Sequence, residues 1–120
     1  MNYLDIDQVF APESVTEVSM IHSIGYLTLW QARELFQKVR RVLKPGGKFI
    51  LETPNQARAV EKIQSAGRNL FEHLEGVRAF HAFGVDQIER RENYHPYAFS
   101  WSEWHLSREL EEAGFGDVRV

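Results

Sequence analysis

Histidines are the side chains of this sequence best suited to metal or proton chemistry, and they are widely scattered. Their spacings fit no zinc-binding pattern, and the absence of cysteine removes thiolate ligands and disulfides. The five positions are His22, His73, His81, His95 and His105. No Ser–His–Asp set, paired carboxylates or phosphate-binding glycine loop is visible either. We therefore expect no metal site, and these motifs alone indicate no catalytic class.

Length and composition exclude several broad classes of partner. The chain has 120 residues, enough for one domain with one core. Its formal net charge of -3 gives no bulk support for binding nucleic acid. No apolar run approaches the roughly 20 residues of a membrane span. The first ten residues carry no basic residue and do not resemble a signal peptide. We expect a soluble, cytoplasmic protein with no nucleic-acid or membrane partner.

The elements that must position any site begin with a strand, a helix and a second strand. Residues 14–21, "SVTEVSMI", mix β-branched and apolar residues over strand length. Thr28 and Gln31 predict a capping box, and apolar residues recur at three and four from 29 to 43. Lys44 is expected in the last helical turn, followed by a turn with Gly46 or Gly47 at positive φ. "KFILET", residues 48–53, then predicts a strand parallel to the first.

The second half of the chain is less regular. We expect Asn55 to cap a helix over residues 56–74, with Gly67 as its weak point. The stretch from 76 to 99 fits either a hairpin or an irregular, lid-like insertion. Ser100 begins a second capping-box pattern, which predicts a helix over 101–113. A strand is expected over the last six residues, 115–120.

Four short motifs follow one another in a fixed order. They are "SVTEV" at 14–18, "HSIGYL" at 22–27, "RVLKPGG" at 41–47 and "EEAGF" at 111–115. As an ordered set they resemble the C-terminal half of a class I S-adenosylmethionine-dependent methyltransferase. The resemblance implies an α/β fold: part of a Rossmann-like domain, with a mostly parallel sheet and flanking helices. It also implies methyl transfer from S-adenosylmethionine to an unidentified, small-molecule acceptor.

The sequence departs from the family pattern at several positions. Thr16 stands where the family often has Asp, and Gly25 and Tyr26 replace a frequent Glu–His pair. The family's glycine-rich loop has no counterpart before the helix at 29, because "GFG" at 114–116 is the first Gly-x-Gly of the chain. We therefore expect one partial domain over 1–120, spanning the family's fourth to sixth strands, and an incomplete fragment. The alternative is a non-catalytic partner or regulatory half-domain that completes another methyltransferase chain.

The resemblance also nominates cofactor-binding residues. Asp5, with Ile6, falls near the spacing at which the family places an adenine-binding Asp, although a solvated terminal acid is equally consistent. His22 matches the family's first His after the fourth strand. Ligands gather at the carboxyl ends of parallel strands. We therefore expect Ser23 and Ile24, like His22, to lie beside the cofactor, and we assign His22 no catalytic role.

Substrate contacts are expected on more variable segments. In the family, the segment after the fifth strand often covers the substrate, and aromatic rings attract a sulfonium cation. The stretch "NYHPYAFSW" at 93–101 fits such a cover, although a packed surface strip is also consistent. The expected substrate-binding residues are Tyr26, Asn55, Tyr94, His95 and Trp101.

The implied sheet is one half of a seven-stranded order, 3-2-1-4-5-7-6. Both strands of the first half of the chain then have an edge without its usual neighbour, which favours self-association through exposed strand edges. Met20, Phe49 and Ile50 are expected to be left partly exposed.

Overall fold

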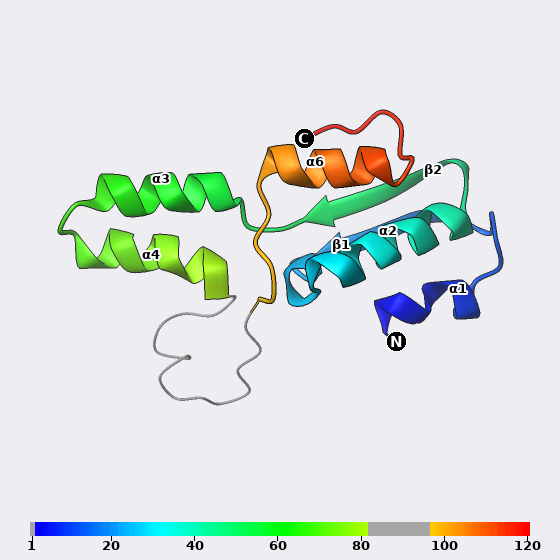
Figure 1. Cartoon of the computed structure of the whole chain (residues 1–120), viewed down its shortest axis with the longest axis horizontal. Coiled ribbons are helices and arrows are strands. Elements are labelled where there is room, and N and C mark those ends of the chain that lie inside the picture. Colours follow the sequence, from blue (N-terminus) through cyan, green and yellow to red (C-terminus); the bar gives the residue numbers. More distant parts are fainter. Residues whose placement is uncertain (1, 82–96) are drawn as a thin grey trace.

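The protein has an α/β fold built on a two-stranded parallel sheet (Figure 1). The computed structural model describes residues 2–81 and 97–120. In chain order the described elements are η1 (Tyr3–Asp5), α1 (Ile6–Val9), β1 (Val15–Ile21), η2 (Ile24–Tyr26), α2 (Leu29–Val42), β2 (Leu43–Glu52), α3 (Gln56–Ala66), α4 (Leu70–His81) and α6 (Glu103–Glu112). None of the helices in these residues is both long and apolar enough to cross a membrane.

The predicted strand–helix–strand unit is confirmed. β1 pairs with β2 in parallel, with Glu17 opposite Lys48 and Ile21 opposite Glu52. α2 begins at the predicted capping box, where the Thr28 hydroxyl accepts a hydrogen bond from the Gln31 N–H at 3.2 Å. The Thr28 N–H in turn donates to the Gln31 side-chain oxygen at 3.0 Å, so two N–H groups are satisfied and the start of the helix is fixed.

The core lies between the sheet and the apolar stripe of α2. Leu35, Phe36 and Val39 are fully buried, and Val18 and Met20 point from β1 into the same cluster. The spacing of three and four along α2 aims these side chains at one face. Met20 was expected to be partly exposed, and this was wrong because the α2 face covers it completely.

The turn after α2 is tighter than predicted. The helix ends at Val42 and β2 begins at Leu43, so Lys44 lies in the strand and not in a last helical turn. The basic residues in the last turn of α2 are Arg40 and Arg41. Gly46 lies inside β2 with a positive φ of 78°, in the irregular stretch where the register shifts. Val15 pairs with Leu43 and Glu17 with Lys48, so the extra residues, 44–47, are on β2.

The single helix predicted over 56–74 is two helices. Gly67, at φ 57°, ends α3, and the chain turns back into α4. The two helices lie side by side and extend away from the sheet (Figure 1). α4 continues to His81, so residues 76–81 are helical and not a hairpin. Gly76 lies close against Ile63 of α3, so this part of α4 packs on the preceding helix. The remainder of the expected insertion, residues 82–96, lies outside the described residues.

The C-terminal segment also differs from expectation. α6 is capped by Ser102, whose hydroxyl accepts from the His105 N–H at 3.2 Å, and not by Ser100. Residues 115–120 form no strand. Asp117 has φ 52°, which is not an extended conformation, and its carboxylate accepts hydrogen bonds from the Nε and Nη2 of Arg119, each at 3.0 Å. Ile50 is 42% exposed, as expected, and Phe49 is half-buried.

Candidate functional site at the carboxyl edge of the sheet

The carboxyl ends of β1 and β2 meet at one edge of the sheet. His22 follows β1 directly, and its N–H donates to the Glu52 carbonyl at 2.8 Å. The ladder therefore continues one residue past β1. Parallel strands bring their following loops together. The "HSIGYL" segment and the Thr53–Asn55 segment consequently lie at the same edge.

His22 and Glu52 also meet through their side chains. The His22 Nε2 lies 3.3 Å from the Glu52 Oε1, and both side chains are 59% exposed. The His22 backbone has φ 56°, in the left-handed region that non-glycine residues seldom occupy. Strained backbone of this kind is concentrated at functional sites, because the surrounding structure must hold it in place.

The segment after His22 turns into the core. Ile24 is fully buried, and the Ser23 hydroxyl is buried with no hydrogen-bond partner among the described residues. A buried hydroxyl without a partner costs stability unless a ligand or water satisfies it. Ser23 therefore fits a bound group that offers a polar atom at this edge.

A second segment of the chain covers this turn. The Gly25 carbonyl accepts hydrogen bonds from the N–H groups of Ala98 at 2.7 Å and Phe99 at 3.3 Å. The Tyr97 ring lies against Gly25 and 5.0 Å, centroid to centroid, from the Tyr26 ring. Burial, together with the neighbouring Tyr26, raises the pKa of the Tyr97 hydroxyl. A Cβ on residue 25 would lie 2.8 Å from the Tyr97 Cε1, so the Tyr97 ring can lie this close to the backbone only because residue 25 is glycine.

Asn55 and Trp101 are joined at the other side of the edge. The Gln56 N–H donates to the Trp101 carbonyl at 2.8 Å, and Asn55 and Trp101 form a parallel bridge. The Asn55 side-chain oxygen accepts from the Ala57 N–H at 3.0 Å, as the predicted cap of α3, and its amide donates to Glu103 at 3.1 Å. The Asn55 amide is therefore committed to holding α3 and α6 together.

Trp101 is almost fully buried, at 1% exposure. Its ring packs on Phe36, Phe99 and His105 at centroid distances of 6.1, 4.8 and 5.1 Å, and its Nε1 has no partner among the described residues. Trp101 therefore joins α2, the 97–101 segment and α6 at the edge of the sheet.

The structure does not bring every predicted residue to this edge. Asp5 is exposed on η1 and Ile6 is buried against α2; the neighbouring Leu4 carbonyl accepts from the Lys38 ammonium at 2.6 Å. Asp5 and Ile6 thus lie against α2 and not at the carboxyl ends of the strands. Tyr94 and His95 lie outside the described residues.

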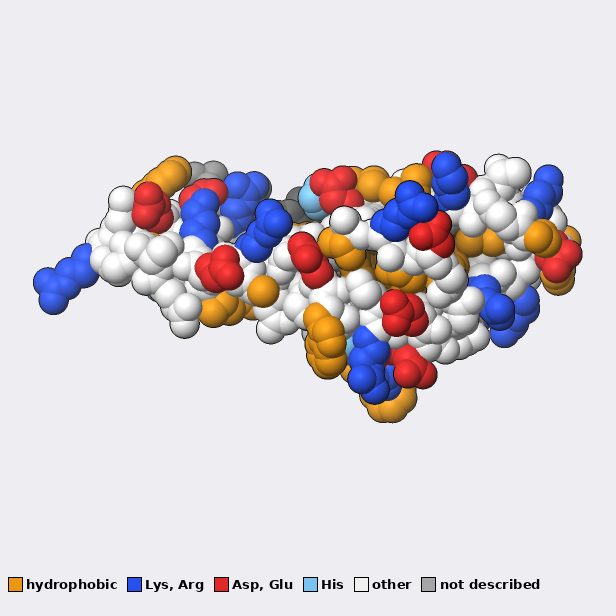
Figure 2. All heavy atoms as spheres, turned by 90° about the horizontal axis from the view of Figure 1, so that it is seen from above, with side chains coloured by type: hydrophobic (Ala, Val, Ile, Leu, Met, Phe, Trp, Pro, Cys, Tyr) orange, Lys and Arg blue, Asp and Glu red, His pale blue; other side chains and the backbone are white. Residues whose placement is uncertain are grey.

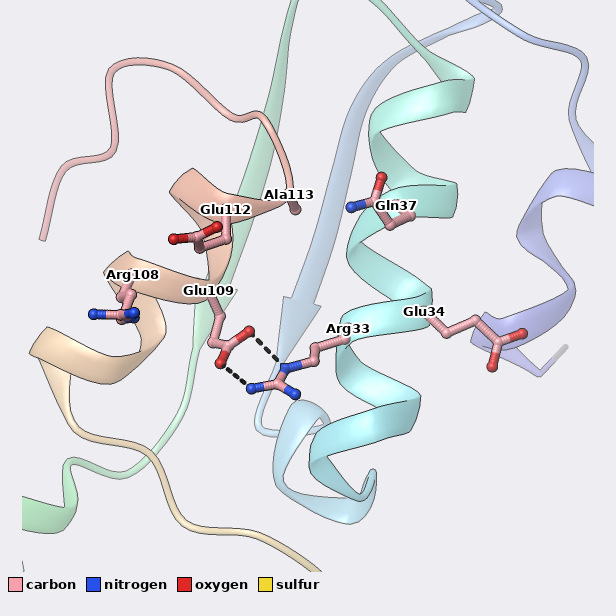
Figure 3. Close-up of a pocket in the computed structure, with 7 residues that line it drawn as sticks. All are labelled: Arg33, Glu34, Gln37, Arg108, Glu109, Glu112 and Ala113. Atoms are coloured by element: carbon pink, nitrogen blue, oxygen red, sulfur yellow. Dashed lines mark hydrogen bonds and ion pairs between the residues drawn. The ribbon is translucent and has the colours of Figure 1, made fainter.

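A partly buried ion pair, not anticipated from the sequence, holds α6 on α2 (Figure 3). Arg33 donates two hydrogen bonds to the Glu109 carboxylate, at 2.9 and 2.7 Å, and the His105 Nε2 lies 3.1 Å from the same carboxylate. The hydrogen bond from Arg33, reinforced by His105, holds the pKa of the Glu109 carboxyl below its ordinary value. The pair borders a cavity of about 490 Å³.

The surface beside the site contains a groove, and its charges are mixed. A groove of about 880 Å³ follows β2 and is bordered by Glu52, Asn55, Trp101, α6 and residues 115–120. Acidic and basic side chains are intermixed over the face seen in Figure 2. Within the described part of the chain, no three His, Asp or Glu side chains gather closely enough to hold a metal ion.

Sequence reasoning missed Glu52 and Tyr97 as members of this edge. Glu52 could have been found from the register, because it ends the strand that was predicted to run parallel to the one ending before His22. Tyr97 belongs to the aromatic stretch 93–101 that was considered as a cover, but its contact with Gly25 depends on tertiary packing, which the sequence does not indicate. No protein-family model, curated protein or solved structure matches this chain.

Proposed function

We propose that the chain serves S-adenosylmethionine-dependent methyl transfer, as part of a Rossmann-like class I methyltransferase domain. The observation that carries the proposal is the placement of the "HSIGYL" segment at the carboxyl edge of a parallel β1–α2–β2 unit. Ligands of open α/β sheets bind at that edge. The order of the four motifs along the chain supports the same family.

The residues at the edge have distinct parts in this proposal. Ser23 offers a buried hydroxyl to the cofactor, and the turn from Ser23 to Ile24 forms the wall beside it. The ring of Tyr97, from the covering segment, pairs with the ring of Tyr26 against this turn, and aromatic faces attract a cation. S-adenosylmethionine supplies an activated methyl group, because its sulfonium is positively charged. The chain's own contribution is then to align the acceptor with that group.

Photochemical cross-linking tests the proposal. Ultraviolet irradiation of the chain with radiolabelled S-adenosylmethionine should place the label on the peptide carrying His22 to Tyr26. Excess unlabelled S-adenosylhomocysteine should prevent the labelling, while excess ATP should not. Label distributed over α3 and α4, or labelling that S-adenosylhomocysteine leaves unchanged, would contradict the proposal. The missing glycine-rich loop predicts binding weaker than micromolar for this chain alone, which calorimetry can measure.

The groove along β2 favours a second candidate function. In this alternative the chain is a non-catalytic partner that pairs with another methyltransferase chain, or with itself, through a strand edge. Within the described residues the sheet has only β1 and β2, so each strand has one edge without a partner strand, and such an edge is a template for pairing. Light scattering that gives a monomer across the accessible concentration range would argue against self-association.

A further inference from the structure

We draw no further inference here: the strongest candidate, the groove of about 880 Å³ between the free edge of β2, α6 and residues 115–120, carries none, because nothing within the described residues shows what covers it.

Discussion

Replacing Trp101 tests whether the carboxyl edge depends on one buried ring. The ring is 1% exposed and packs on Phe36, Phe99 and His105. An aromatic side chain buries about 200 Å², which at about 25 cal/mol per Å² corresponds to about 5 kcal/mol as an upper value. Large-to-small changes of this kind cost about 3–5 kcal/mol. Trp101→Ala should therefore remove a large part of the roughly 5–15 kcal/mol by which a domain is stable.

The assay is urea unfolding followed by far-ultraviolet circular dichroism. Trp104→Ala is the matched control, because Trp104 lies three residues further on, is 71% exposed, and should change the free energy of unfolding by about 0.5 kcal/mol or less. Trp101→Phe keeps most of the packing and discards the unpaired Nε1, so it should cost less than about 1.5 kcal/mol. Equal losses for the two alanine variants, or a loss under about 1 kcal/mol at Trp101, would refute the packing described.

Three further outcomes follow from individual contacts. Hydrogen bonds from Arg33 are the chief reason that the pKa of the Glu109 carboxyl is lowered in the folded chain. The carboxylate therefore stabilises the fold at pH values above 4.5, its ordinary pKa. This stability is lost as the pH falls through the lower pKa of the folded chain. Glu109→Gln should therefore flatten the acid limb of a melting-temperature profile against pH. Thr28→Ala removes the cap of α2 and should lower the free energy of unfolding by about 1 kcal/mol, measured by urea titration. Gly25→Ala should displace the Tyr97 ring and move the raised pKa of its hydroxyl toward the ordinary value, seen in a spectrophotometric tyrosine titration.

Each of these variants has a control within the chain. Glu112→Gln alters an exposed carboxylate on the same helix and should leave the acid limb unchanged. Ser65→Ala alters an exposed hydroxyl within α3 and should cost less than the Thr28 change. Gly116→Ala adds a Cβ into open space and should leave the tyrosine titration unaltered. If a control variant changed the measured quantity as much as its partner variant did, the contact proposed for the partner residue would be contradicted.

Local patterns were sufficient to predict the sheet and its helix. The period of apolar residues in α2, the Thr28–Gln31 capping box and the β-branched run of β1 are all short-range signals, and each is confirmed. Parallel pairing followed from the length of the connection, because a crossover needs a helix of about this size.

Elements that depend on tertiary packing were predicted less well. Gly67 was recognised as a weak point, but whether a glycine weakens a helix or ends it depends on what the next segment can pack against. Here α4 returns onto α3 through Gly76 and Ile63. Likewise, the cap of α6 is Ser102 and not the predicted Ser100, because Trp101 is held outside the helix by its bridge with Asn55.

The positions of the nominated residues in the fold were predicted in part. His22, Ser23 and Ile24 lie at the carboxyl edge because strand direction alone puts them there. Asp5 was placed by its distance along the chain from Ser14, and spacing does not determine the direction in which a terminal segment folds. η1 and α1 instead lie on α2, where Lys38 holds the Leu4 carbonyl and lies 3.6 Å from Asp7.

The most direct test of the central claim is a titration of the isotopically labelled chain with S-adenosylmethionine, followed by amide nuclear magnetic resonance. This measurement detects weak binding and locates it. The account predicts shifts at residues 22–26 and at Asn55, unchanged amides at Leu70 and Phe71 in α4, and no response to ATP. Unchanged amides at residues 22–26 at saturating cofactor, or equal shifts with ATP, would contradict the claim that this edge is a site for S-adenosylmethionine.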